Sequence, residues 1–315
     1  MHKEISVRNM PHRSSPSSAK SRVALTVSIA TCIMVTATGC GRPRLPTPAS
    51  DSDAVKALRA TLSAEDASAE DGANVGASSG TGWGTLTGRF VFVGTPPAAK
   101  QLIVDKDTAV CTAGGRKLFE QSLQVDESTG GLAQVVVFAR NVSRVKEREV
   151  PEEPLIFDQA ACEFLTPVFA ARVGQPIDVR NSDPIGHNTN ISGTSFNQLI
   201  PAGEGTLFTP SVETGMPTMV TCNIHPWMKA YAVFREDGYV AVSGADGTFT
   251  ITDLPAGEQL ELQVWHERST GANGALAADM PEYDWSSKGR FTVTLAPDQT
   301  TNIGDVEIPA SALGG

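Results

Sequence analysis

Apolar and polar residues alternate along short stretches of the chain from Trp83 onward, which is typical of half-buried β-strands. Residues 84–93 alternate in this way and end at a Gly-Thr-Pro-Pro turn signal. Residues 133–140 form a Val-rich run that favours a second strand. Further short strands are expected within residues 168–179 (two strands), 218–222, 230–235, 239–243, 248–252, 260–266, 290–295 and 301–308. Because no sustained helical period occurs, the sequence predicts an all-β fold of sandwiches or barrels.

Residues 1–40 follow a different pattern, which is typical of an export signal. A basic segment, residues 1–22, precedes the uncharged and mostly apolar residues 23–38, and Gly-Cys follows. This apolar stretch is slightly shorter than the about 20 residues of a membrane-spanning helix. The ending resembles a bacterial lipobox with Cys40 as the lipidated residue, although Ala37 stands where leucine is usual. A plain signal peptide or an uncleaved anchor is the alternative, and every version exports the rest of the chain.

Residues 41–82 are rich in Pro, Ala, Ser and Gly and carry few apolar side chains, so we expect a disordered tether. The chain has 315 residues and a net charge of −10, which loss of the basic leader would make more negative. Nucleic-acid binding is excluded because a basic footprint is absent. The expected location is periplasmic or on the outer cell surface, with the membrane reached through a lipid anchor at Cys40.

The most informative cluster is His187 together with residues 222–228, which read Cys-Asn-Ile-His-Pro-Trp-Met. One thiolate, two imidazoles and one thioether are ligand types that suit copper cycling between Cu(I) and Cu(II). A strand is expected to end at Cys222, and two intervening residues bring His225 around the tip of the next loop. Zinc is the alternative metal, but methionine is a poor zinc ligand and the set lacks the usual numbers of Cys and His.

The spacing Cys-x-x-His-x-x-Met, preceded by Asn181 and by the pair His187-Asn188, resembles the cupredoxins. The short ligand loop is most similar to that of amicyanins and is also plastocyanin-like. This resemblance covers about residues 155–235. It implies a Greek-key β-sandwich that holds one type 1 copper.

The resemblance also implies roles for single residues. The equatorial copper ligands would be His187, Cys222 and His225, and the axial ligand would be Met228. Asn188 would join the two ligand loops by hydrogen bonds near the sulfur, where such groups tune a metal.

Two further expectations concern the surroundings of the copper. Gly186 is a candidate for a backbone carbonyl on the other axial side. The outer edge of His225 is expected near the surface, in an apolar docking patch formed by Gly186, Pro226 and Trp227.

A second resemblance lies in residues 243–257 and 260–264, whose Asp-Gly-x-Phe-x-Ile and Leu-Pro-x-Gly patterns are similar to those of carboxypeptidase regulatory-like or Cna-B-like sandwiches. That family also opens with a strand like residues 84–93. We therefore expect an N-terminal β segment at residues 83–150, a copper domain at 151–236 and a second sandwich at 237–310. The copper domain is either inserted into a sandwich that begins at Trp83 or precedes a separate one.

The remaining cysteines and histidines have simpler expectations. Once the leader, lipid-site and metal-site cysteines are set aside, Cys111 and Cys162 remain as one pair in an oxidising compartment. We expect a disulfide that fastens the loop of residues 105–115 to the copper domain, with two inert buried thiols as the alternative. His266 is expected to be structural, rather than part of a second metal site or a docking patch.

These features predict an exported, membrane-tethered copper protein that carries single electrons between redox partner proteins, such as cytochromes. Enzymatic activity is not expected, because multicopper oxidases and copper nitrite reductases need further His-rich sites and the chain has no His-x-His pair. Copper delivery or storage is one alternative, but it favours exposed Met- or His-rich sites. A structural surface lipoprotein, in which copper only adds stability, is the other.

Overall fold

The computed structural model describes residues 80–314, which fold almost entirely into β-strands, as the sequence predicts. The strands are β1 (Trp83–Val93), β2 (Val136–Ala139), β3 (Leu155–Ala160), β4 (Glu163–Phe164), β5 (Val168–Arg172), β6 (Ile177–Asn181), β7 (His187–Ile191), β8 (Asn197–Ile200), β9 (Gly205–Phe208), β10 (Thr218–Thr221), β11 (Lys229–Arg235), β12 (Val240–Val242), β13 (Thr248–Pro255), β14 (Gln259–Trp265), β15 (Arg290–Thr294) and β16 (Thr300–Pro309). The short helices are α2 (Thr108–Cys111), η1 (Ala113–Gly115), η2 (Ala272–Gly274), η3 (Pro281–Tyr283) and η4 (Ala310–Leu313).

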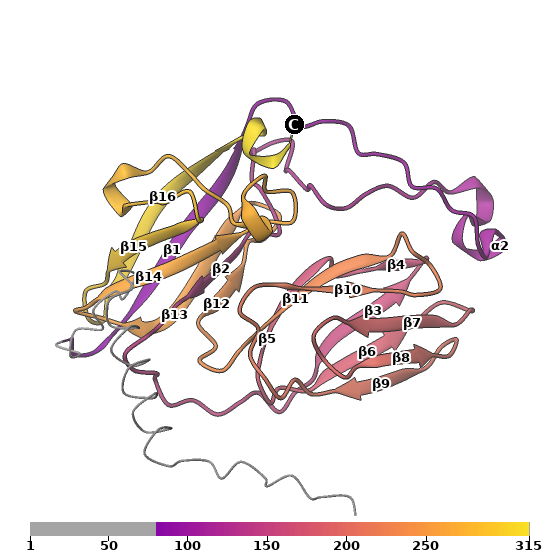
Figure 1. The fold of residues 1–315 in the computed structure, drawn as a ribbon, viewed down its shortest axis with the longest axis horizontal. Coiled ribbons are helices and arrows are strands. Elements are labelled where there is room, and N and C mark those ends of the chain that lie inside the picture. The colour runs from indigo at the N-terminus through magenta and orange to yellow at the C-terminus, as the bar shows by residue number, and fades with distance from the viewer. Residues whose placement is uncertain (1–79, 315) are drawn as a thin grey trace, which may run out of the picture. The chain divides into compact units, whose positions relative to one another are not determined.

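One sandwich is built from both ends of the described chain. Its sheets have the strand orders β13-β1-β16 and β12-β2-β14-β15, and they enclose a common apolar core. The early strand β1 runs parallel to the last strand, β16, which Figure 1 shows as indigo beside yellow. Every second side chain of β1 is buried, including Leu86 and Phe90, as its alternating pattern predicts.

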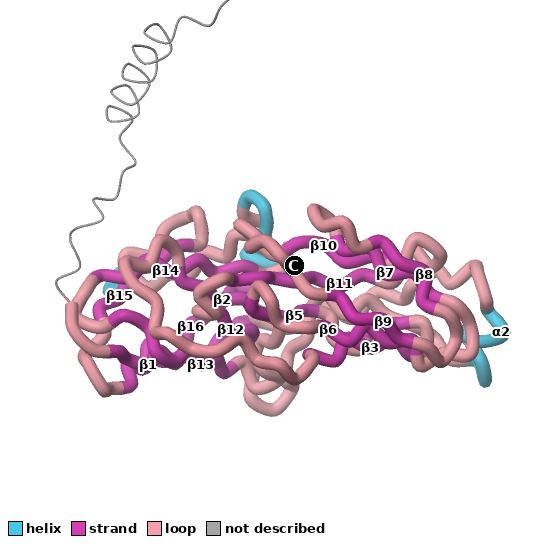
Figure 2. Tube along the Cα trace, turned by 90° about the horizontal axis from the view of Figure 1, so that it is seen from below, coloured by secondary structure: helices cyan, strands magenta, loops and turns pink. Residues whose placement is uncertain are grey.

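The strands between β2 and β12 in the sequence form the other sandwich. Its sheets have the orders β5-β11-β10-β7-β8 and β4-β3-β6-β9, and its core includes Phe157, Phe169 and Phe234. The first of these sheets is seen along β10, β11, β7 and β8 in Figure 2. The strands β1 and β2, which precede this second sandwich in the sequence, pair with strands of β13–β16, which follow it. This pairing is that of a sandwich inserted into another, one of the two arrangements that the sequence leaves open.

The continuous Val-rich run of β2 has its explanation in a layer shared by the two sandwiches. Val135 and Val137 point into the core of the sandwich that contains β1. Val136 and Phe138 pack in the opposite direction, in a cluster that also contains Val233 of β11. All four residues of β2 are buried as a result, which is why this strand reads as apolar throughout rather than alternating.

Several elements carry little sequence signal and were not expected. Besides β3, these are the short strands β4, β8 and β9 and the strand β7. β7 consists of His187, Asn188, Thr189, Asn190 and Ile191, which lack an apolar alternation. These strands form because neighbouring strands supply hydrogen-bond partners, so their formation depends on tertiary context more than on propensity.

Some expectations fall outside the described residues: the export signal at residues 1–40, lipidation of Cys40 and nearly all of the tether at 41–82. Within residues 80–314, the structure contains no helix long and apolar enough to cross a membrane.

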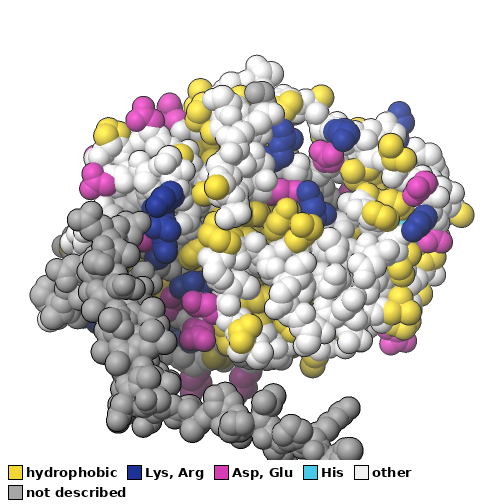
Figure 3. Space-filling view, in the orientation of Figure 1, with side chains coloured by type: hydrophobic (Ala, Val, Ile, Leu, Met, Phe, Trp, Pro, Cys, Tyr) yellow, Lys and Arg dark blue, Asp and Glu magenta, His cyan; other side chains and the backbone are white. Residues whose placement is uncertain are grey.

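On the face drawn in Figure 3, acidic and basic side chains are interspersed rather than gathered into areas of one charge.

His266, which directly follows β14, is fully buried. Its Nδ1 accepts the backbone N–H of Arg268 at 3.1 Å. Its burial is incompatible with a docking patch, and it belongs to no metal-type cluster among the described residues. Burial lowers the pKa of His266 from 6.5 to about 4.

This buried histidine gives a pH-dependent prediction. The unfolded chain protonates His266 near pH 6.5 and the folded chain only near pH 4, so the unfolded state binds more protons in between. The contribution of neutral His266 to the unfolding free energy is therefore fully present above pH 6.5 and is lost as the pH falls. The loss is roughly 2.5 kcal/mol at pH 4.5. Urea unfolding of metal-free protein at pH 7.5 and 4.5 measures this loss. The loss should be smaller in His266→Gln by this same contribution, roughly 2.5 kcal/mol, and an equal loss in both proteins would contradict the assignment.

Candidate metal centre

Two neighbouring strands bring the predicted ligands together. His187 begins β7, and Cys222 directly follows β10, which pairs antiparallel with β7 through Asn190 and Thr221. The start of one strand and the end of its antiparallel neighbour lie at the same edge of the sheet. His225 returns to this edge from the loop of residues 222–228, which connects β10 to β11.

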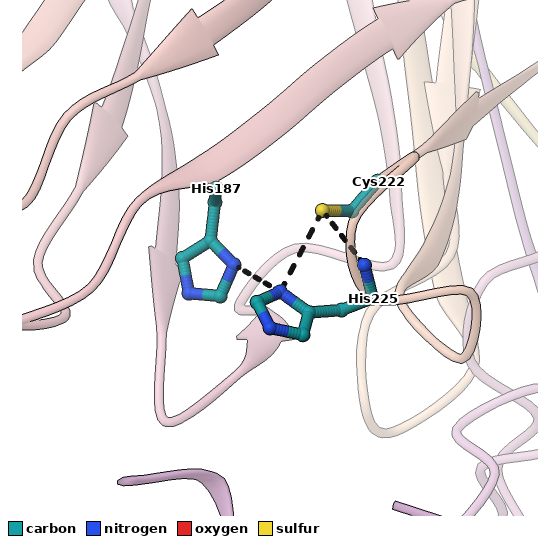
Figure 4. Close-up of side chains that lie close together, drawn as sticks. All are labelled: His187, Cys222 and His225. Atoms are coloured by element: carbon teal, nitrogen blue, oxygen red, sulfur yellow. Dashed lines mark hydrogen bonds between the residues drawn. The ribbon is translucent and has the colours of Figure 1, made fainter. Parts of the chain in front are cut away.

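The donor atoms of these three residues converge, as Figure 4 shows. The Nδ1 atoms of His187 and His225 are 2.9 Å apart, and Cys222 Sγ lies 3.8 Å from the Nδ1 of His225. All three donors lie within 4.8 Å of one another. Both histidines are fully buried and the cysteine is 2% exposed, so the side chains form a closed, nearly dry cluster.

Hydrogen bonds within the chain fix the ligand loop. The backbone N–H of Met228 donates to the carbonyl of His225 at 2.9 Å, and that of Cys222 donates to the carbonyl of Met228 at 3.3 Å. Met228 is 2% exposed and packs in the same core as Cys222. The indole N–H of Trp227 donates to the carbonyl of Cys162 at 3.1 Å, which holds the loop from outside.

The sulfur of Cys222 lies in a polar backbone environment. The N–H groups of Asn188 and His225 point to Sγ at 3.3 and 3.4 Å. The side-chain oxygen of Asn188 accepts the N–H of Asn223 at 3.2 Å, so Asn188 contacts both ligand-bearing segments. Such N–H groups orient the sulfur. Gly186 directly precedes His187, and its role as an axial carbonyl stays a prediction.

The outer nitrogens of both histidines meet carboxylates that were not singled out in the sequence. Asp183 lies 2.7 Å from Nε2 of His187, and Asp107 lies 2.8 Å from Nε2 of His225. Asp183 stands four residues before His187, a spacing that could have marked it. Asp107 lies in the expected loop of residues 105–115, but nothing in the sequence distinguishes it from Asp105.

These contacts determine which ring nitrogens can bind a metal. A carboxylate only accepts hydrogen bonds, so an imidazole that bonds to one through Nε2 donates an N–H there, and its Nδ1 is the nitrogen that faces inward. Burial lowers the pKa of His187 below 6.5, and the hydrogen bond to Asp183 opposes this shift. With both Nε2 protons directed to carboxylates, the Nδ1 atoms of His187 and His225 face each other at 2.9 Å, an arrangement that a shared cation stabilises.

The donor set fits a metal ion, and copper in particular. Metals hold imidazole nitrogen at about 2.0–2.1 Å and thiolate sulfur at about 2.3 Å, so donors around one ion lie roughly 3 to 4 Å apart. The separations of 2.9 and 3.8 Å agree with this. A thiolate with two imidazoles, near a buried methionine, suits copper better than zinc or a hard cation.

One expectation about this centre is wrong. The outer edge of His225 does not reach the surface: the side chain is fully buried, and Asp107 covers its Nε2. An acidic residue, Asp107, therefore covers His225 where an apolar patch is expected, although Pro226 is exposed and Trp227 is partly exposed. The reason is the segment of residues 100–120, in which Lys106 contacts Ile224 and Asp107 contacts His225 of the ligand loop.

Cys111 and Cys162 form a disulfide, with their Cα atoms 5.3 Å apart. It joins residues 100–120 to the corner between β3 and β4 of the sandwich that holds the metal centre. Cys162 also lies near Asp183 and His187, in a group with metal-type spacing. Because its sulfur is bonded to Cys111, Cys162 offers no thiolate and this group is not a second metal site.

Comparisons with known proteins return little. No protein-family model and no curated protein matches the chain. Similar solved structures include a copper-containing nitrite reductase from Thermus scotoductus SA-01, with 18% identity and a TM-score of 0.25 over 30% of this chain. They also include amicyanin from Paracoccus versutus, with 15% identity and a TM-score of 0.24 over 31% of this chain. The match spans 25% of the nitrite reductase chain and 97% of the amicyanin chain. TM-scores this low do not indicate a shared function.

Proposed function

We propose that this chain is an exported type 1 copper protein that carries single electrons between redox partner proteins. The observation that supports the proposal is the buried convergence of Cys222 Sγ with the Nδ1 atoms of His187 and His225. Met228, buried in the same core, would be the fourth ligand. Bound copper would supply a one-electron couple between Cu(I) and Cu(II).

The chain's own residues would keep the site unchanged between oxidation states. Two N–H groups fix the sulfur of Cys222, a carboxylate fixes each histidine, and loop hydrogen bonds fix Met228. Burial of His187, Cys222, His225 and Met228 excludes water from the donors. A site that moves little on gaining an electron suits electron transfer, whereas copper delivery favours exposed, exchangeable ligands.

The finer parts of the proposal concern location. The lipobox-like ending at Cys40 and the composition of residues 41–82 support a membrane-anchored lipoprotein on a tether, in the periplasm or on the outer surface. The disulfide between Cys111 and Cys162 suits an oxidising compartment outside the cytoplasm.

A partner protein would approach at Trp227 rather than at His225. A cavity of about 730 Å³ borders the ligand loop and is lined by residues that include Trp227, Pro226 and Phe119. The rings of Trp227 and His225 have centroids 5.1 Å apart, so the indole connects this cavity to the candidate ligands. Phe119, 42% exposed, adds apolar surface beside it.

Voltammetry of the copper-loaded full chain, combined with a copper-transfer assay, tests the proposed function. We expect a reversible one-electron wave, rapid electron exchange with a soluble cytochrome c, and retention of copper against a moderate chelator after reduction. Loss of copper to the chelator on reduction, without electron exchange, would overturn electron transfer in favour of copper delivery.

A further inference from the structure

Both candidate histidine ligands are held from outside by a carboxylate, but the two carboxylates have different origins. Asp183 is 6% exposed and comes from the segment just before His187. It also accepts the backbone N–H groups of Ala161 and Cys162, each at 2.7 Å. Asp107 comes from 118 residues before His225, and its side chain is 46% exposed.

Asp107 belongs to a segment that covers the ligand loop, residues 100–120, which we call the cover segment. Its two ends pair with each other: the N–H of Leu102 donates to the carbonyl of Leu118, and the N–H of Glu120 donates to the carbonyl of Lys100. The ammonium group of Lys106 donates to the carbonyl of Ile224 at 3.1 Å. Asp107 and Lys106 thus contact adjacent residues of the ligand loop.

The disulfide anchors the cover segment close to both carboxylates. Cys111 follows Asp107 by one turn of α2, and the backbone N–H of Cys162 donates to Asp183. The guanidinium of Arg116 donates to the carbonyls of Cys111 and Ala161 at 2.7 and 2.6 Å, which joins the two sides of the disulfide again. The cover segment is therefore fixed at the place where Asp107 meets His225.

We propose, building on the copper site proposed above, that Asp107 is a positioning residue that holds His225 with Nδ1 inward, and that the cover segment closes the site against copper exchange. A carboxylate on the outer nitrogen makes an imidazole a stronger donor and orients its ring. Its negative charge also favours Cu(II) over Cu(I). Loss of Asp107 should therefore weaken Cu(II) binding more than Cu(I) binding, raise the reduction potential and speed copper release.

Three variants of the full chain separate these effects. Asp107→Ala removes both the charge and the hydrogen bond, whereas Asp107→Asn keeps an acceptor oxygen without the charge. Asp105→Ala is the matched control, because Asp105 is an exposed acidic residue of the same segment. The measurements are Cu(I) and Cu(II) affinities by chelator competition, the rate of copper release, the reduction potential, and the ¹⁵N signals of the His225 ring in metal-free protein.

For Asp107→Ala we expect the Cu(II) affinity to fall at least about tenfold, with little change in the Cu(I) affinity. The reduction potential should rise by about 59 mV for each tenfold loss of Cu(II) affinity relative to Cu(I) affinity. Copper release should accelerate more than tenfold, and the His225 ring should lose its preference for the proton on Nε2. Asp107→Asn should keep slow release but share the higher potential, and Asp105→Ala should match the unaltered protein.

Equal potentials, release rates and ring signals in Asp107→Ala and Asp105→Ala would overturn the proposal. A lower melting temperature of metal-free Asp107→Ala, with an unchanged potential, would also overturn it and leave a purely structural role. The ring signals are recorded without copper, so they test the positioning of His225 independently of copper binding. Failure of the unaltered protein to bind copper would refute the proposed function by itself.

Discussion

Replacing Cys222 by serine is expected to lower the affinity for copper by more than about 100-fold, since even an outer partner of a ligand is commonly worth ten- to 100-fold. The reason is that serine supplies no thiolate, the softest donor of the cluster. Cys222 is the free cysteine among the described residues, so the change leaves the disulfide intact. Chelator competition with Cu(I) at neutral pH measures the loss.

A matched variant, Met228→Leu, separates loss of a donor from disturbance of the core. Leucine fills a similar apolar volume, and an axial thioether is a weak ligand, so the copper affinity should fall less than about tenfold. The metal-free forms of both variants should melt within a few degrees of the unaltered protein. Equal copper affinity in Cys222→Ser and the unaltered protein would remove Cys222 from the site.

Removal of the disulfide has the second large expected effect, on stability. The bond joins residues 51 positions apart, and a loop of this length corresponds to roughly 4 kcal/mol of chain entropy in the unfolded state. We expect the double variant Cys111→Ser, Cys162→Ser to lose about 3 to 4 kcal/mol of unfolding free energy in denaturant titrations of metal-free protein.

Reductant provides the control for this variant. Dithiothreitol should destabilise the unaltered protein by a similar amount and leave the double variant unchanged. A double variant as stable as the oxidised protein would contradict the expected contribution. Because the disulfide anchors the cover segment, the double variant should also release copper faster than the unaltered protein, which the assay used for Asp107 can measure.

The fold was predictable where one periodicity governs a strand. The strict alternation of β1 and the apolar run of β2 both correspond to observed strands. The candidate ligands were recognisable because Cys222, His225 and Met228 lie within one short loop. The sequence does not predict strand β7, because its residues are mostly polar. They are buried through their place at the site and their pairing with β8 and β10, not through apolar side chains.

The surroundings of the ligands could not be predicted in the same way. The contact between Asp107 and His225 spans 118 residues and depends on how the cover segment folds over the loop. The disulfide expected between Cys111 and Cys162 placed this segment near the copper domain, but it could not select Asp107 over Asp105. For the same reason the sequence does not predict that Asp107 covers the outer edge of His225, which is expected in an apolar patch near the surface.

The most direct test of the copper site is the visible absorption and EPR spectrum of the full chain loaded with Cu(II), recorded beside Cys222→Ser. We predict an intense blue thiolate-to-copper band and an EPR signal from one copper per chain. The band should bleach reversibly with reductant and be absent from the serine variant. A colourless protein that takes up no copper, or a copper spectrum identical in the serine variant, would contradict a cysteine-ligated copper site.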